Sequence, residues 1–162
     1  MTNRVEALST GTAHVPWWVR TFSSVLERLL RAGVPLGFNA LVTTRGRTSG
    51  QPRTTPIAVI KVGDRRWIWA PWGEVNWVRN LRATGRATVT VRDRSEEFGA
   101  TELDATQRVE FFRDVLAPVA RRIPLGYWFI RFVDQVDLNH PDEAAERTRV
   151  FELRPLPAPS RV

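Results

Sequence analysis

The chain has 162 residues, a length that suits one compact domain with a single core. It contains no cysteine, which excludes disulfides, thiolate nucleophiles and cysteine-ligated zinc or iron–sulfur clusters. The net charge is +7, and Lys61 is the only lysine among 24 basic residues. Arginine binds carboxylates and phosphates through paired hydrogen bonds, so this excess suits an anionic partner, although codon usage in a GC-rich genome would produce the same excess.

The N-terminal third predicts a tail and then a helix. Residues 1–14 show no periodicity and should form a flexible tail, whereas residues 15–33 carry apolar side chains at helical spacing between a Pro and a Gly. This amphipathic helix should pack on its own domain, with peripheral contact to a membrane surface as the alternative. No signal pattern occurs and no apolar run approaches the roughly 20 residues of a membrane span, so we expect a cytoplasmic protein.

The next segment predicts three strands. β-branched and aromatic residues dominate it, and Gly63-Asp64 is a hairpin signal. Pro56 has no backbone N–H, so its part of the strand should lie at a sheet edge or a strand entrance. The expected strands are residues 39–45, 53–62 and 65–71.

The second half of the chain mixes helices and strands. Asp104 and Gln107 form a capping box that should open a helix, and Pro118 and Pro124 should interrupt the helical pattern after it. No pattern assigns the aromatic segment 127–133. The other expected elements are a helix at 74–85 ending at a Gly, a hairpin of strands 87–92 and 96–103 with its turn at 93–95, a strand at 149–155, and a Pro-rich tail at 157–162.

This order of elements predicts an α+β fold. About six mainly antiparallel strands in a chain of this length should curl into a small barrel flanked by helices. The alternating strand and helix units of a doubly wound fold are missing, which disfavours dinucleotide binding of the Rossmann type. We expect one domain at residues 15–156, without internal repeats.

The polar residues give little support for self-contained catalysis. His14 lies in the expected tail and His140 in a turn-like NHPD sequence, where surface histidines are the expected outcome. No Ser-His-acid arrangement or metal-ligand spacing occurs, so no metal is expected. The basic residues are spread along the chain without a recognition motif, so nucleic acid is not an expected partner.

The sequence TTRGRTSGQPRTTP, residues 43–56, has the composition of an anion-binding loop. Gly46 and Gly50 permit turns with positive φ, in which successive amide groups converge on an anion. A solvated basic hairpin loop is the alternative that composition leaves open. Further donors are the hydroxyls of Thr48 and Ser49 and the guanidinium groups of Arg45, Arg47 and Arg53.

A second cluster, residues 67–81, holds four of the seven tryptophans. Within it, residues 70–73 lie where a strand ends and a helix begins, so an aromatic ring stands near helix-entry amides. That combination would suit a flat heterocycle with an anionic tail. Trp67 and Trp69 share one strand face, which either packs in the core or borders a groove.

Taken in order, TTRGRTSGQPRTTP, WIWAPWG and NWVRNLRATGRATVTV resemble the deazaflavin-dependent nitroreductase family, whose members use coenzyme F-420 and include quinone reductases. The resemblance covers residues 39–91 well and the rest in outline. It implies a split β-barrel related to the barrels that bind flavin mononucleotide. It also implies hydride transfer from reduced F-420 to an electron-poor acceptor such as a quinone, a nitroaromatic or an activated alkene, a small-molecule partner.

The resemblance implies how the coenzyme is held. Arg47, Thr48, Ser49 and Arg53 would meet the phosphate and glutamate tail. Residues 54–56 would line the groove, 69–72 would lie beside the ring, and 76–80 would close the site. Thr48 stands where many relatives carry Lys and Trp72 where some carry a cation, so both remove positive charge. The implied coenzyme-binding residues are Arg47, Thr48, Ser49, Gly50, Arg53, Thr54, Thr55, Pro56, Trp69, Ala70, Pro71, Trp72, Asn76, Trp77, Val78, Arg79 and Asn80.

Tyr127, the only tyrosine, is the candidate for a wall of the acceptor site or for a proton donor, with a packed aromatic as the alternative. No general acid is needed if solvent delivers the proton. Two other functions stay open at this point: a reductase of the same fold that uses flavin mononucleotide, and a protein that stores F-420 without turnover. The sequence does not choose between a monomer and a homodimer.

Overall fold

The structure is a computed structural model, and its described residues are Val25, Arg28, Leu29, Ala32 and the ranges 39–124, 126–132 and 134–157, without the side chains of Phe129 and Phe132. Within the expected N-terminal helix, Val25, Arg28 and Leu29 are helical; the rest of that helix, His14 and most of both tails lie outside the described residues. The domain bounds therefore stay a prediction. Among described residues, no helix has the length and apolarity needed to cross a membrane.

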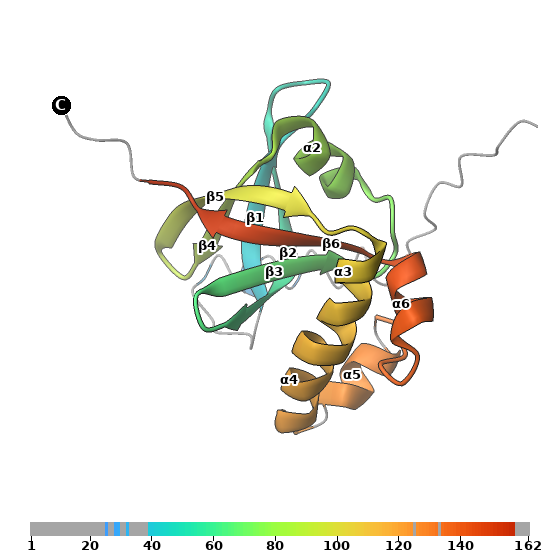
Figure 1. Cartoon of the computed structure of the whole chain (residues 1–162). Coiled ribbons are helices and arrows are strands. Elements are labelled where there is room, and N and C mark those ends of the chain that lie inside the picture. The colour runs from blue at the N-terminus through green and yellow to red at the C-terminus, as the bar shows by residue number, and fades with distance from the viewer. Residues whose placement is uncertain are drawn as a thin grey trace, which may run out of the picture.

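Six antiparallel strands close into a barrel in the order β1-β2-β3-β6-β5-β4 (Figure 1). The predicted barrel flanked by helices is confirmed. The first hairpin turns at Gly63, with φ 59°, and the second at Arg92 and Asp93, one residue earlier than expected. The strands are β1 (Asn39–Arg45), β2 (Pro52–Val62), β3 (Arg65–Ala70), β4 (Arg86–Val91), β5 (Arg94–Glu102) and β6 (Arg149–Pro155).

Strand β2 changes partners along its length. Residues 52–58 pair with β1, whereas pairing with β3 begins only at Val59. Pro56 lies opposite Leu41 of β1, in the part of β2 that has no register partner on β3. A proline is tolerated there because its missing N–H falls on an edge, as expected. This part of β2 contains residues 54–56, which the family resemblance assigns to the lining of a groove.

A short helix, α2 (Asn76–Thr84), connects β3 to β4. It ends at Gly85, which has φ 63° and donates its N–H to the Leu81 carbonyl oxygen at 2.7 Å. The predicted glycine stop is confirmed, because the left-handed C-cap needs a residue without a Cβ.

The long connection from β5 to β6 contains a helix whose middle turn is π-helical. Asp104 accepts a hydrogen bond from the Gln107 amide at 2.9 Å, as the capping box predicts. The prediction that Pro118 breaks this helix is wrong, because Pro118 lies in the first turn of α4, where a missing N–H is tolerated. The helix instead ends before Pro124, at Ile123, which is extended. The three segments are α3 (Ala105–Glu110), η1 (Phe111–Leu116) and α4 (Ala117–Arg122).

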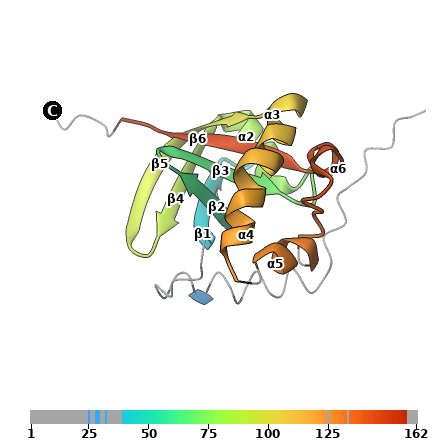
Figure 2. The same cartoon turned by 60° about the horizontal axis from the view of Figure 1, so that its bottom comes forward.

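Two more helices complete the connection. The unassigned aromatic segment forms α5 (Gly126–Phe132), and α6 (Pro141–Arg147) was not predicted from sequence. The turn-like NHPD sequence leads into α6, whose first helical residue is Pro141. Figures 1 and 2 show α3 to α6 gathered on one side of the barrel, away from α2.

The core has two parts, one inside the barrel under α2 and one between the barrel and α3–α4. Trp67 and Trp69 are 2% and 5% exposed, and their rings lie 6.0 and 6.2 Å from the ring of Phe111. They therefore pack in the core and do not border a groove. Phe111 opens the π-helical segment, so this irregular turn presents its ring to both tryptophans.

Candidate functional site

The loop between β1 and β2 is closed by its own hydrogen bonds. Gly46 donates to the Gln51 carbonyl oxygen and Gly50 to the Gly46 carbonyl oxygen, both at 2.8 Å. The Gln51 amide donates to Ser49 Oγ at 3.3 Å. Gly50 has φ 66°, which a residue with a Cβ would adopt only with strain. These backbone amides are therefore already hydrogen-bonded within the loop. An anion would be bound mainly by the side chains of the loop and less by its backbone amides.

One side chain of α2 holds this loop. The backbone N–H and the Nη1 of Arg47 both donate to Asn80 Oδ1, at 3.2 and 3.0 Å. Asn80 is only 5% exposed, and Thr84 Oγ1 donates to its carbonyl oxygen at 3.0 Å. The loop and the helix therefore form one wall, which brings together two residues that lie 33 positions apart.

The arginines of the loop have no carboxylate partner, a condition that they share with Arg79, Arg86, Arg92, Arg94, Arg121, Arg122 and Arg147 elsewhere in the described chain. Elsewhere in the described chain, ion pairs with carboxylates occupy Arg65, Arg66, Arg82, Arg113, Arg131, Arg149 and Arg154. None of the described carboxylates pairs with Arg45, Arg47 or Arg53, and all three are exposed. What distinguishes the loop is that three exposed arginines without carboxylate partners lie in one short segment. The exposed wall presents unneutralised positive charge.

The beginning of β2 continues that wall. Thr54, Thr55 and Pro56 are half-buried beside the edge of β2 that lacks a β3 partner. The hydroxyls of Thr54 and Thr43 are hydrogen-bonded at 2.8 Å across the β1–β2 pair. Thr48, Ser49 and Gly50 are exposed at the tip of the loop.

At the turn after β3, only some of residues 69–72, which were predicted to lie beside the coenzyme ring, are accessible. Trp69 and Ala70 are buried, whereas Pro71 and Trp72 are half-buried. The indole Nε1 of Trp72 is enclosed and has no hydrogen-bond partner in the described part of the chain. A Cβ on Gly73, which has φ 68°, would stand 3.1 Å from the Arg147 carbonyl oxygen, so this turn is pressed against the end of α6.

Helix α2 presents its predicted residues in several environments. Asn76 is exposed and Arg79 half-buried, and both can reach a ligand. Trp77 packs on Phe151 with ring centroids 6.0 Å apart. Val78 is fully buried under the helix, so its side chain supports the wall from behind.

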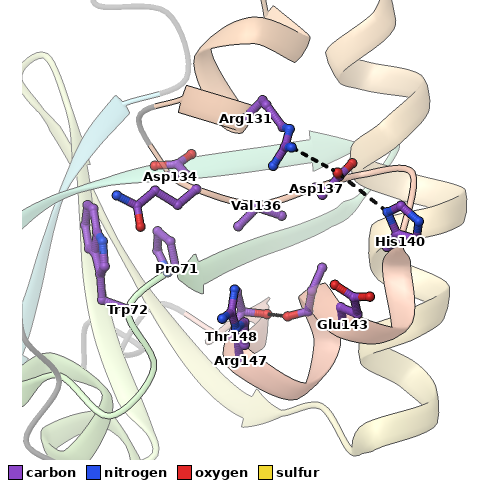
Figure 3. Close-up of a pocket in the computed structure, with 12 residues that line it drawn as sticks. Pro71, Trp72, Arg131, Asp134, Val136, Asp137, His140, Glu143, Arg147 and Thr148 are labelled. Atoms are coloured by element: carbon purple, nitrogen blue, oxygen red, sulfur yellow. Dashed lines mark hydrogen bonds and ion pairs between the residues drawn. The ribbon is translucent and has the colours of Figure 1, made fainter.

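A pocket of about 550 Å³ opens beside Trp72 (Figure 3). Pro71 and Trp72 form part of its lining, and the rest comes from α5, α6 and the segment between them, which sequence reasoning did not assign to a site. Asp137 links Arg131, at 3.4 Å, to His140 Nδ1, at 3.5 Å. No motif marks these residues, because they meet Trp72 only after the barrel closes.

Asp134 is the unusual group of this pocket. Burial raises the pKa of its carboxyl group to about 7. The residue as a whole is half-buried, so burial reduces the contact of its carboxyl group with water without removing it. No hydrogen bond or ion pair joins that carboxyl group to another described residue, and no charged neighbour contributes to the shift.

Tyr127 lies elsewhere. It is a half-buried residue of α5 that packs against the core beneath α3–α4, and its hydroxyl accepts a hydrogen bond from the Asn139 side-chain amide. It is not part of the pocket lining. Among described residues, no group of three His, Asp or Glu is placed to hold a metal ion.

Comparisons with known proteins bear on both fold and family. The family model described as F-420H(2)-dependent quinone reductase matches residues 18–122. A solved structure described as a domain-swapped dimer is 20% identical, covers 85% of this chain and 97% of its own, and has a TM-score of 0.52. An F-420-H2 dependent reductase is 18% identical, with 72% and 94% coverage and a TM-score of 0.50.

A third structure, from Bacteroides thetaiotaomicron and described provisionally as a 5-nitroimidazole antibiotic resistance protein, is 9% identical. It covers 80% of this chain and 79% of its own, with a TM-score of 0.53. At these identities the three structures bear on the fold alone, and they agree with the closed barrel described above.

Proposed function

The chain belongs to the F-420H(2)-dependent quinone reductase family, and on that premise we propose that it transfers a hydride from reduced coenzyme F-420 to an electron-poor small molecule. The acceptor class is a quinone, a nitroaromatic or an activated alkene. The coenzyme supplies the hydride from C5 of its deazaflavin ring. The protein supplies position, charge and exclusion of water.

The observation that carries this proposal is the set of loop arginines without carboxylate partners. The tail of F-420 is a phosphodiester followed by glutamates, and guanidinium forks bind such groups in pairs of hydrogen bonds. Arg47 and Arg53 are the proposed clamps, with Arg45 beside them. Three unneutralised arginines exceed what the single phosphate of flavin mononucleotide requires, which favours the deazaflavin coenzyme.

The remaining residues fit around that tail. Thr48, Ser49 and Gly50 would meet the phosphate, Thr54 to Pro56 would line the groove, and Asn76, Arg79 and Asn80 would close it from α2. Pro71 and Trp72 would lie beside the ring, because they are the accessible members of their turn. Trp69, Ala70, Trp77 and Val78 would support this surface from the core.

Titration of the purified protein separately with F-420 and with flavin mononucleotide, followed by tryptophan fluorescence, tests the proposal. We expect saturable quenching by F-420, since Trp72 and Trp77 belong to the proposed site. Reduced F-420 should then be consumed when menadione is added. Saturable binding of flavin mononucleotide alone would contradict the assignment, and binding of reduced F-420 without turnover would favour storage.

Cytoplasmic localisation, contact of residues 15–33 with a membrane surface, and the choice between monomer and homodimer stay predictions.

A further inference from the structure

The pocket beside Trp72 is distinct from the arginine loop but adjoins the proposed coenzyme site. No residue of the segment 43–56 lines it, whereas Pro71 and Trp72, proposed to flank the deazaflavin ring, do. A second molecule in this pocket would therefore lie on the ring side of the site, away from the binding site of the anionic tail. Hydride transfer requires an acceptor in such a place.

The charged groups of the pocket are arranged so that Asp134 is left without a partner. In the view of Figure 3, Asp134 lies toward Pro71 and Trp72, whereas the Arg131–Asp137–His140 chain extends toward α6. Arg131 is therefore engaged by Asp137 and does not neutralise Asp134. The titratable or charged groups that line the pocket with it are Arg131 of α5, Asp137 and His140 of the connecting segment, and Glu143 and Arg147 of α6; the turn with Pro71 and Trp72 adds none.

The backbone beside Asp134 is held in an unusual conformation. Gln135 has φ 56°, a left-handed conformation that is uncommon for residues other than glycine. The Val136 amide closes this turn by donating to the Ile130 carbonyl oxygen at 3.2 Å. Such conformations persist only where the surrounding structure imposes them, and they cluster at functional sites. Here the turn places Asp134 and Gln135 on the pocket lining.

We propose that this pocket binds the hydride acceptor and that the Asp134 carboxyl group donates the proton that completes its reduction. This inference rests on the proposed function. Hydride addition to a quinone or an enone leaves an oxyanion on the acceptor; the Asp134 O–H bond breaks, its proton joins that oxygen, and solvent later returns a proton to the carboxylate. The enclosed Trp72 Nε1–H, which has no partner in the described chain, is a second donor for an acceptor oxygen.

The alternatives are less well placed. Tyr127 is outside the pocket lining, and its hydroxyl already accepts a hydrogen bond from Asn139. Asp137 accepts a hydrogen bond from the Asn139 backbone N–H and also contacts Arg131 and His140, and these contacts, the first above all, lower the pKa of its carboxyl group. With a pKa of about 7, the Asp134 carboxyl group carries a proton in about half of the molecules at pH 7 and can still release it.

The first test needs no coenzyme. NMR of isotope-labelled aspartate carboxyl groups should show one group that titrates near pH 7 and that is missing in D134N. Menadione should move this titration in the free protein. A pKa of Asp134 in the ordinary range near 4 would overturn the inference whatever the enzyme does.

The second test follows single-turnover oxidation of reduced F-420 by menadione from about pH 5.5 to about pH 9. The wild-type rate should fall as pH rises through about 7, where Asp134 loses its proton. D134N should react about 100-fold more slowly than the wild type, and its rate should not fall as pH rises through about 7. D134E should recover part of the rate. The affinity for F-420 should not change in either variant. D114N, at an exposed aspartate of η1 outside the pocket lining, is the matched control and should keep the wild-type fall in rate.

The outcomes separate the two proposals. If wild-type protein does not bind F-420, the proposed function fails, and the carboxyl titration still decides the state of Asp134. If F-420 binds and D134N matches the wild-type rate and pH profile, the proton-donor role is wrong although the reductase function stands. If D134N does not fold, the wild-type titration and pH profile decide alone.

Discussion

Asn80 Oδ1 accepts both the backbone N–H and the Nη1 of Arg47, so one amide oxygen fixes the proposed clamp without neutralising it. An acidic residue at this position would hold the loop as well, but it would also occupy the guanidinium charge. The neutral amide thus serves both geometry and charge. Thr48, at the exposed tip of the same loop, is likewise uncharged.

The variant N80D tests the role of this neutral amide. Its carboxylate should pair with Arg47, and we expect the affinity for F-420 to fall by about tenfold while the melting temperature is kept or raised. Isothermal titration calorimetry and a thermal melt measure the two effects. Unchanged affinity would show that Arg47 does not bind the tail.

The variant T48K places a cation at the exposed tip of the loop. An added ammonium group near the phosphate should tighten F-420 binding by about three- to tenfold at low salt, with a steeper loss of affinity as salt rises. T106K, at an exposed position of α3 remote from the loop, changes net charge equally and should leave affinity unchanged. Equal effects of both variants would mean that only total charge matters.

Helix α2 is anchored to the barrel by ionic side chains. Arg82 contacts Glu74 at 2.6 Å and also pairs with Glu102, and Arg149 contacts Glu74 at 3.2 Å. These groups are only partly exposed, unlike the Arg113–Asp114 pair of η1. Because α2 carries Asn80, the network also positions the loop through the helix.

Removal of Arg82 tests this anchoring. R82M should lower the free energy of unfolding by about 1–2 kcal/mol, whereas R113M should lower it less because its pair is exposed. Arg82 is the main cause of the lowered pKa of Glu74, so the stability from Glu74 is present above its unfolded pKa and is lost as pH falls through its folded pKa. In chemical denaturation, the free energy of unfolding of R82M should therefore decrease less on acidification than that of the wild type. Equal effects of the two substitutions would contradict the anchoring role.

The sequence predicted correctly those turns and helix caps whose geometry depends only on neighbouring residues. Gly63, Gly85 and the Asp104–Gln107 box specify turns and caps through their own backbone, and all three were placed correctly. The continuity through Pro118 was not predictable, because the π-helical turn depends on Phe111 packing against two tryptophans about 40 residues earlier in the chain. Helix α6 was missed because its seven residues offer little more than an Ala pair to the core.

The same distinction applies to the candidate site. The loop arginines and Asn80 were proposed as site residues because their motifs follow one another along the chain, and the family resemblance that these motifs indicated is confirmed by the match over residues 18–122. The pocket was missed because Trp72 and Asp134 become neighbours only through barrel closure and the packing of α5 and α6. Neither composition nor spacing carries that information.

Over the whole molecule, carboxylates pair with some of the described arginines, whereas unpaired arginines occur in the loop and also elsewhere, for example Arg79, Arg92 and Arg121. The three loop arginines place part of the positive charge where a polyanionic coenzyme would bind, and Asp134 lies on the ring side. A buried carboxyl group without a partner costs stability once it is ionised, a cost that functional sites commonly carry.

That cost predicts how global stability depends on pH. The folded pKa of Asp134 is raised to about 7, above the unfolded value near 4, so its contribution is full below about pH 4 and is lost as pH rises through 7. D134N cannot ionise and should therefore melt at a higher temperature than the wild type at pH 8, with little difference at about pH 4. D114N should show the opposite sign, because Arg113 lowers the pKa of Asp114 and its ionised form is the stabilised one. Equal melting of D134N and wild type at both pH values would mean that the Asp134 carboxyl group is solvated, which would remove the basis for a neutral proton donor in this pocket.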